Sequence, residues 1–257
     1  TAGPMARSVE DLALTMNVLV YPDQRDPASV PTGYTDYLSA LSGHIRGMRI
    51  GVPTEYVWDP ISAEVESAVR QALAVLAELG AEVVDVSIPE LEWTPTLAVS
   101  ITTAEAAIAH GRTVVESGEH MDQAVRRRFE SGLFIPATTY AHAQRARILY
   151  TQKLTAVFDQ VDLLAMPTVA TPAPPQEAAT TVLGGQEVAV REALLRLTRI
   201  FNIARLPGVS IPCGFSAEGL PIGLMIGGAA FQDATVLRAA HAYQTATDWH
   251  NRQAPLH

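Results

Sequence analysis

Cysteine is nearly absent from this sequence, which has a single one, Cys213, among 257 residues. One thiol excludes an internal disulfide and any metal site built from several cysteines. The seven histidines show no His-Glu-x-x-His spacing, which is a common arrangement of zinc ligands on a helix. We therefore expect neither a metal nor another cofactor.

Positive charge is also scarce. Lysine and arginine together number 18 against 27 acidic residues, the formal net charge is -9, and Lys153 is the only lysine. No basic run is longer than Arg126-Arg127-Arg128, so we expect no binding to nucleic acid through its phosphates. The single lysine also restricts any lysine-dependent mechanism to one position in the middle of a predicted helix.

Long apolar runs are missing as well. None approaches the roughly 18 residues that a membrane span needs, and Thr1-Ala2-Gly3-Pro4 lacks the charged start of a signal peptide. We expect a cytoplasmic location and no membrane partner. The start at a Gly-Pro without Met is interpreted as the sign of a processed or truncated product.

The sequence does contain the pattern of an α/β fold, with a mixed sheet flanked by helices. Ser8 is placed to cap a helix that ends near residue 20. Residues 48–53 and 81–88 have the pattern of strands, and the apolar face of residues 62–79 indicates a helix between them. Strand, helix and strand in this order predict a crossover that joins two parallel strands.

The rest of the chain is divided between helices and short strands. Residues 97–160 predict three helices, with interruptions at Gly118, Gly132 and Pro136. The remaining expected elements are a buried strand at 162–166, an extended loop at 168–175, a helix at 188–200, strands at 208–212 and 222–226, and a helix at 234–247 with Asp233 as its N-cap.

Two side chains are nucleophiles by residue type. Ser210 lies in Gly-Val-Ser-Ile-Pro, where proline replaces the second glycine of a Gly-x-Ser-x-Gly elbow. Cys213 has no neighbouring histidine to lower the pKa of its thiol. We therefore interpret Ser210 as a residue of a strand interior and Cys213 as a small buried side chain.

Two further patterns favour structural roles. Glycine recurs every fourth residue from Gly219 to Gly227, which differs from the phosphate-binding fingerprint and favours close packing of strands. His142, Arg145 and Lys153 fall in one helical segment, where charged residues usually form a solvated face. Neither pattern predicts a catalytic group.

Several segments occur in the order of a known family. Ala-Arg-Leu-Pro-Gly-Val-Ser-Ile-Pro-Cys-Gly-Phe at 204–215 is followed by Gly-Leu-Pro-Ile-Gly-Leu-Met-Ile-Gly at 219–227. Before them come Gly-Pro-Met-Ala-Arg-Ser-Val-Glu-Asp-Leu-Ala at 3–13, Asp-Gln-Arg-Asp-Pro at 23–27 and Asp-Leu-Leu-Ala-Met-Pro-Thr at 162–168. With these segments the chain resembles the amidase signature family from end to end.

The resemblance implies the C-terminal portion of an amidase. Family members hydrolyse carboxylic amides with a serine that a second serine and a lysine activate, and the resemblance places all three before Gly3-Pro4. The sequence has no Gly-Ser-Ser segment, and Lys153 stands in none of the family's catalytic contexts. We therefore expect residues 1–257 to be the C-terminal part of a single amidase signature domain, with an incomplete fold and no activity alone.

The resemblance also implies which residues line the substrate pocket. These are Arg128 in the arginine-rich helix, Thr168 after the Met-Pro step, and Phe201 and Asn202 before the Leu-Pro-Gly turn. Loops that follow strands at the edge of an α/β sheet are where ligands usually bind. Simpler roles stay open for three of them: Arg128 as a surface cation, Thr168 as a loop cap and Phe201 as a core residue.

The same resemblance indicates the substrate and the partners. Leu195 occupies the position where glutamine-using transamidase subunits carry an acid for the substrate amine, which favours a free-standing amidase acting on an uncharged or apolar amide. The alternatives are a subunit of a glutamine-dependent amidotransferase and a non-catalytic binding domain. Expected partners are the small-molecule amide, the missing N-terminal part of the enzyme and a second copy, since an unpaired strand edge invites pairing.

Overall fold

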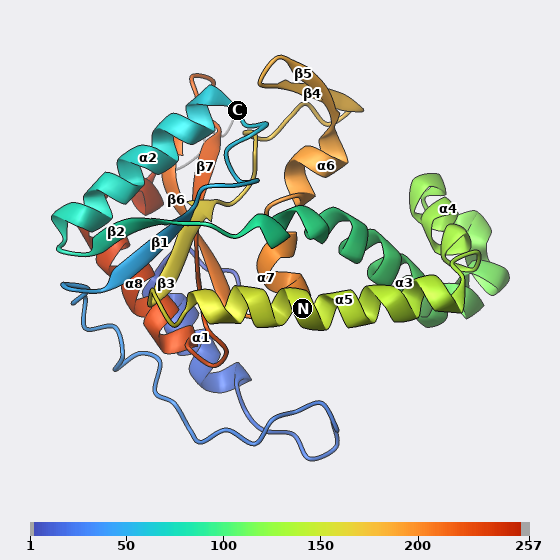
Figure 1. Ribbon diagram of the computed structural model, residues 1–257, viewed down its shortest axis with the longest axis horizontal. Helices are drawn as coiled ribbons and strands as arrows, with labels where there is room; N and C mark the ends of the chain where they lie inside the picture. The colour runs from blue at the N-terminus through green and yellow to red at the C-terminus, as the bar shows by residue number, and fades with distance from the viewer. Residues whose placement is uncertain (1–2, 253–257) are drawn as a thin grey trace.

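A mixed five-stranded sheet forms the centre of the fold in the computed structural model, which describes residues 3–252. Its strands are β1 Arg49–Pro53, β2 Glu82–Val86, β3 Leu163–Pro167, β6 Gly208–Phe215 and β7 Pro221–Gly228. They lie in the order β2-β1-β3-β7-β6 (Figure 1). Strands β1, β2 and β3 are parallel, whereas β7 is antiparallel to both β3 and β6. The predicted mixed α/β sheet is confirmed.

The predicted crossover is present between β1 and β2. These strands pair in parallel from Arg49 opposite Glu82 to Pro53 opposite Val86, and helix α2, Ala63–Glu78, connects them. Gly80 follows the helix with a φ of +95°, a left-handed conformation that glycine adopts without steric cost. The sequence pattern was sufficient here because the helix face, its cap and both strands are local in the chain.

The first helix begins where its cap predicts. Helix α1, Val9–Leu19, has Ser8 as its N-cap, and the Asp11 amide donates to Ser8 Oγ at 3.0 Å. The Val9 amide donates to Gln244 Oε1 at 2.8 Å, which joins α1 to the last helix, α8, Asp233–Ala246. The start of α1 is thus fixed against α8, which lies near the other end of the chain.

Side chains alternate between the two faces of the sheet, as the period of a strand requires. Along β3, Leu163 and Ala165 join the apolar cluster that contains α1, α2 and α8, whereas Leu164 and Met166 join the cluster on the other face. The second face is covered by helices α3 Thr94–Ser117, α5 Ala137–Val157 and α7 Arg199–Ala204. The result is a sheet between two helical layers (Figure 1).

Three helices occupy the middle segment, as predicted for residues 97–160. Helix α4, Gln123–Gly132, lies between α3 and α5 in the chain and sits at the end of their pair farthest from the sheet (Figure 1). A Cβ at Gly132 would lie 2.2 Å from the Thr103 carbonyl oxygen, so only glycine allows α4 to approach α3 this closely. A short helix at Gly118 and the N-cap at Pro136 account for the other two interruptions.

The helix predicted at 188–200 is wrong in part. Strands β4 Thr180–Leu183 and β5 Gln186–Ala189 form a separate hairpin, which places Val188 opposite Thr181. Gly184 and Gly185 make its turn with φ angles of +55° and +80°, both left-handed. Helix α6, Val190–Leu195, begins only after this hairpin and is separate from α7.

The cap predicted for the last helix is also wrong. Gln232 is the N-cap of α8, and Asp233 is the first residue within the helix. The reason is that the Gln232 carbonyl already accepts from the Val236 amide at 3.0 Å, while its side-chain oxygen accepts from Thr235 Oγ1 at 2.8 Å. Asp233 still places a negative charge in the first helical turn, where it is favourable.

Strand β6 lies at the edge of the sheet and pairs with β7 alone among the strands of residues 3–252. Such an edge presents backbone groups for pairing. A second copy as partner, the single-domain organisation of residues 1–257 and a cytoplasmic location stay predictions. Among the described helices, none is long and apolar enough to cross a membrane.

Candidate functional site

A hollow of about 400 Å³ lies at the edge strand β6, and we call it the edge hollow. Thr168 reaches it from the loop after β3, Ser210 from β6, and Phe201 and Asn202 from α7. Side chains of α1 and α8 complete its wall. Three of the four site residues expected from the sequence therefore meet here.

Two hydroxyl groups form the polar part of the edge hollow. Thr168 Oγ1 and Ser210 Oγ are 2.7 Å apart and share a hydrogen bond. A Cβ at Gly223 would lie 2.8 Å from each of these oxygens, so the glycine on β7 leaves the space in which they meet. The Thr168 hydroxyl therefore faces the hollow and contacts Ser210. The Thr168 backbone amide donates to the Gly223 carbonyl at 3.0 Å.

Phe201 forms the apolar part of the same hollow. Its ring covers Gly227 so closely that a Cβ there would lie 2.1 Å from the ring, and a Cβ at Gly208 would lie 3.4 Å from it. Phe201 is 3% exposed and belongs to the apolar cluster beneath α3 and α5. It is thus both a core residue and a wall of the hollow, and Gly227 permits close packing of a helix side chain on the strand, whereas the sequence predicted close packing between strands.

A second and larger depression, of about 890 Å³, lies between the helices of the α3–α5 layer, and we call it the arginine groove. Asn202 lines both this groove and the edge hollow. Two carboxylates, Glu105 and Asp233, and the apolar Leu195 also line the groove. Its five arginines are Arg128, Arg147, Arg191, Arg199 and Arg205.

Arg128 is the fourth site residue expected from the sequence, and it lies in the arginine groove rather than in the edge hollow. It is half-buried on α4, and its guanidinium donates to Thr102 Oγ1 at 3.2 Å. Burial lowers the pKa of Arg128, and the nearby positive charges of Arg191 and Arg199 lower it further. This environment distinguishes Arg128 from an ordinary surface cation.

Two buried arginines hold the segment that carries the groove. Arg199 Nη1 donates to both carboxylate oxygens of Glu192, at 2.9 and 2.8 Å. Arg196 is 6% exposed and donates to the backbone carbonyls of residues 56, 59 and 60 at 2.6 to 2.7 Å. Its guanidinium also lies over the Tyr56 ring, 4.9 Å from the centroid. Arg199 thus joins α7 to α6, and Arg196 fixes this segment against residues 56–60.

Sequence reasoning missed Arg191, Arg196 and Arg199. Their only signal was the presence of three arginines within an otherwise apolar stretch, and that stretch was predicted as one continuous helix. The hairpin and the break between α6 and α7 change which way each side chain faces. Helical periodicity therefore could not show that Arg191 and Arg199 approach Arg128.

The remaining candidates show no catalytic surroundings. Burial raises the pKa of the Cys213 thiol to about 12, so it stays protonated and unreactive at neutral pH. Ser210 has Thr168 as its side-chain partner, and neither a lysine nor a histidine lines its hollow. Lys153 is 63% exposed on α5, 4.0 Å from Glu90, and His142 on the same helix is also exposed. Within residues 3–252, no group of three or more metal-ligating side chains is found.

Known proteins are similar in sequence to this chain over nearly its whole length. The family model described as Amidase matches residues 1–237. A glutamyl-tRNA(Gln) amidotransferase subunit of Chloroflexus aggregans is 39% identical over 280 residues, covering 99% of this chain and 56% of that protein. An amidase of Pseudomonas putida is 37% identical over 255 residues, covering 99% of this chain and 54% of that protein. The chain thus spans about half the length of these curated relatives.

Solved structures share the fold as well. The structure of a bacterial aryl acylamidase, described as a member of the amidase signature enzymes, matches with a TM-score of 0.80 and 28% identity. The match covers 97% of this chain and 53% of the acylamidase. Both hollows are formed by residues inside the range that the family model matches. Sequence, fold and family model agree, and this chain belongs to the amidase signature family.

Proposed function

We propose that this chain forms the substrate-binding wall of an amide hydrolase, in which Arg128, Thr168, Phe201 and Asn202 contact a small-molecule amide. The observation that carries the proposal is that these four residues, distant in the sequence, line two hollows that share Asn202. Membership of the amidase signature family supports the reaction class.

The proposed reaction adds water across the amide C–N bond and gives a carboxylate and ammonia or an amine. It requires a nucleophile, a base that accepts its proton, and hydrogen-bond donors for the oxyanion. The 257 residues contain no Gly-Ser-Ser segment, and Lys153 lies exposed on α5. We therefore assign the nucleophile and base to a further portion of the same enzyme, corresponding to the part of its relatives that this chain does not match.

Each wall residue has a role that its surroundings support. Thr168 and its partner Ser210 provide hydroxyls that donate to or accept from an amide group, while Phe201 provides an apolar surface. Asn202 is exposed where the two hollows meet. Arg128 brings positive charge to the arginine groove, which Asn202 also lines. These contacts bind and orient the substrate but do not transfer its protons.

An amidotransferase component is the second candidate, because a relative with 39% identity has that name. Leu195 lines the arginine groove with an apolar side chain, at the position where the resemblance implies an acid for the substrate amine. This favours a free-standing amidase. A binding domain without catalysis is the third candidate, and the labelling and kinetic experiments below test it.

A fluorophosphonate probe tests where the nucleophile is. The 257-residue chain should show no adduct in its intact mass, because among residues 3–252 no serine hydroxyl is hydrogen-bonded to a lysine or histidine side chain. A trypsin-like serine protease, labelled in parallel, serves as the positive control for the probe. Stoichiometric labelling of Ser210 would place the nucleophile in this chain and overturn the proposal.

Kinetics of the complete enzyme test the wall. The change Phe201→Ala should raise KM for an amide, while kcat changes by less than about tenfold, since uniform binding contacts affect KM alone. Phe134→Ala is the matched control, because Phe134 is 84% exposed and lines neither hollow. Loss of acylation by several orders of magnitude in a folded Phe201→Ala variant would show that this chain takes part in the chemistry itself.

A further inference from the structure

One buried arginine lies outside both hollows. Arg196 is the C-cap of α6, is 6% exposed and lines neither the edge hollow nor the arginine groove. Burial lowers the pKa of its guanidinium, because the charged form loses hydration. Among the described residues Arg196 forms no ion pair, and its side chain donates to backbone carbonyls. The segments that these hydrogen bonds join indicate what the buried cation does.

The segment that accepts the hydrogen bonds begins with an uncommon backbone conformation. Tyr56 has a φ of +69°, which is left-handed and rare for a large side chain. Arg196 Nη1 donates to the Tyr56 carbonyl at 2.7 Å, and the guanidinium lies over the Tyr56 ring. Nη1 also donates to the Asp59 carbonyl at 2.7 Å, and Nη2 donates to the Pro60 carbonyl at 2.6 Å. Such conformations persist where the surroundings determine them, and Arg196 supplies these contacts.

The loop that carries Thr168 is tied to both sides of this contact. Ala170 lies two residues after Thr168 and is fully buried. Its carbonyl accepts from the Ser62 amide at 2.8 Å, and its amide donates to the Ala193 carbonyl at 3.3 Å. Ser62 continues the segment that Arg196 holds, and Ala193 belongs to α6. Three segments therefore meet in a closed ring of contacts, and Arg196 joins two of them.

The direction of the Thr168 side chain depends on this ring. Before Thr168 the chain is fixed by the sheet, since the Thr168 amide donates to the Gly223 carbonyl at 3.0 Å. After Thr168 the chain has left β3 and is held at Ala170. Because the bonds at an α-carbon have nearly fixed angles, the backbone on both sides sets where the side chain points. A shift of Ala170 therefore turns the Thr168 hydroxyl, whose oxygen lies 2.7 Å from Ser210 Oγ.

The opposite wall of the edge hollow has anchors of its own. The Ile200 carbonyl on α7 accepts from Tyr150 Oη at 3.1 Å, and Tyr150 is fully buried on α5. Phe201 packs so closely on Gly227 of β7 that a Cβ there would meet its ring. These contacts do not involve Arg196. Loss of the Arg196 hydrogen bonds should therefore affect the Thr168 side of the hollow.

Resting on the function proposed above, we propose that Arg196 is a positioning residue of the amide hydrolase, which holds residues 56–62 against α6 and thereby directs the Thr168 hydroxyl toward the substrate amide. Arg196 itself contacts no substrate. An amide bound beside a misdirected hydroxyl loses one hydrogen bond. Because that bond is made with the substrate and with the transition state alike, its loss raises KM and leaves kcat nearly unchanged.

Steady-state kinetics of the complete enzyme test this role, with whichever of acetamide, butyramide and benzamide it hydrolyses fastest. Arg196→Met keeps a long side chain but removes its donors, and we expect KM to rise about fivefold, as the loss of one hydrogen bond gives. The kcat per folded enzyme, corrected by near-UV circular dichroism, should stay within about threefold. A loss of stability alone lowers the amount of active enzyme and leaves KM unchanged. Arg196→Lys should restore part of the affinity, because an ammonium still donates to carbonyls.

A double-mutant cycle tests the route through Thr168. The Thr168→Val background has no hydroxyl to direct, so Arg196→Met should change KM there by less than about twofold. Arg70→Met is the matched control and should leave KM unchanged. Arg70 lies over the ring of Trp58, in the loop that Arg196 holds, but pairs with Glu66 and lines neither hollow. An unchanged KM in Arg196→Met, or a rise that persists in the Thr168→Val background, overturns the inference.

Hydrogen exchange followed by mass spectrometry gives a readout that needs no activity. In Arg196→Met, peptides that contain the Ser62 and Ala170 amides should exchange at least about tenfold faster, while peptides from β1 keep their wild-type rates. Equal acceleration in all these peptides, or in none, contradicts a positioning role. Failure of the proposed function gives a different result: exchange changes at Ser62 and Ala170 as expected, but the complete enzyme hydrolyses none of the three amides.

Discussion

The two hollows share a wall but differ in how their polar groups are satisfied. The residues common to both are Thr198, Asn202, Leu206, Pro207 and Asp233. In the edge hollow, the hydroxyls of Thr168 and Ser210 bind each other, and the rest of the surface is largely apolar. In the arginine groove, Arg128 and Arg191 have no acidic partner among residues 3–252. A largely apolar compartment, with Asp233 at its border, therefore adjoins one lined by five arginines.

The comparison shows that one short helix, α7, contributes side chains to both hollows and to the core. Helix α7 presents Phe201 to the sheet and Asn202 to both hollows, and its end at Arg205 is left-handed with a φ of +58°. The edge hollow includes residues of strands β6 and β7, whose positions the sheet fixes. The groove is built on helices from separate parts of the chain, so its charge pattern is set by tertiary packing.

The largest effect should come from alkaline pH, which acts on the apolar cluster that contains α1, α2 and α8. Burial raises the pKa of Tyr243 from 10.0 to about 12, and that of Cys213 from 9.0 to about 12. A raised pKa in the folded state means that stability is complete below the usual value and is lost as pH rises through the folded one. We expect the free energy of unfolding to fall by several kcal/mol between about pH 9 and pH 12.

Urea unfolding at a series of pH values measures this loss. Tyr243→Phe should flatten the decline, because phenylalanine has no proton to lose. Tyr21→Phe is the control, since Tyr21 is 82% exposed, and it should leave the profile unchanged. A wild-type profile that is level to pH 12 would contradict the buried, neutral state of these groups.

A methyl group at Gly227 should displace Phe201, the apolar wall of the edge hollow. Gly227→Ala would place its Cβ 2.1 Å from the Phe201 ring, so the ring or β7 must move. We expect a loss of about 3 kcal/mol in the free energy of unfolding, the upper range for overpacking. Gly111→Ala on α3, where nothing lies within 4 Å, should instead stabilise the protein by up to about 1 kcal/mol. Equal stability of the two variants in urea would show that Phe201 is free to relocate.

Replacing Arg196 should weaken the attachment of α6, the helix that carries Arg191 into the arginine groove. Arg196→Met leaves three partly buried carbonyl acceptors without their donor, and we expect a loss of about 2 kcal/mol in chemical unfolding. Arg147→Met removes an arginine that has no side-chain partner within residues 3–252, and it should change stability by less than about 0.5 kcal/mol. Similar losses in both variants would mean that the three hydrogen bonds to segment 56–60 add nothing.

The smallest expected effect concerns the two hydroxyls of the edge hollow. A double-mutant cycle of Thr168→Val and Ser210→Ala should give a coupling energy of about 1 kcal/mol, because each hydroxyl is the side-chain partner of the other. Thr168→Val combined with Ser131→Ala, a serine on α4, should be additive. Additivity of the first pair as well would show that water replaces the missing hydroxyl without cost.

Local signals explain how much of the fold was predictable. The cap at Ser8, the crossover around α2 and the breaks at Gly118 and Gly132 all depend on residues close in the chain. The helix expected at 188–200 failed because the Gly184-Gly185 turn draws Val188 into a ladder, and this competes with helical periodicity.

The sequence predicted those residues of the candidate site that lie in segments covered by the family resemblance. Thr168, Phe201 and Asn202 lie in segments that the family resemblance covers, and the structure brings them together. The approach of Arg191 to Arg128 depends on how α6 packs near α4, which no local pattern encodes. The balance of charge in the groove therefore became visible only in three dimensions.

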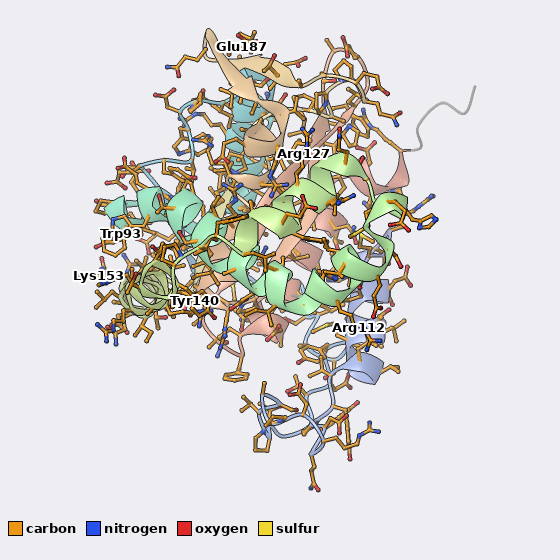
Figure 2. The ribbon with its side chains drawn as sticks, turned by 90° about the vertical axis from the view of Figure 1, so that its right-hand side faces the viewer. Trp93, Arg112, Arg127, Tyr140, Lys153 and Glu187 are labelled. Carbon is orange, nitrogen blue, oxygen red and sulfur yellow. The ribbon has the colours of Figure 1, made fainter. Side chains whose placement is uncertain are left out.

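The single lysine gives the molecule one ε-amino group for amine-directed chemistry. Lys153 is 63% exposed on α5 and lies apart from Arg127 in Figure 2. Within these 257 residues, a reagent selective for the lysine ε-amino group therefore attaches at one known point, with one orientation of both hollows. A lysine-to-lysine cross-link between two copies of the chain would have a single interpretation, the meeting of one α5 helix with another.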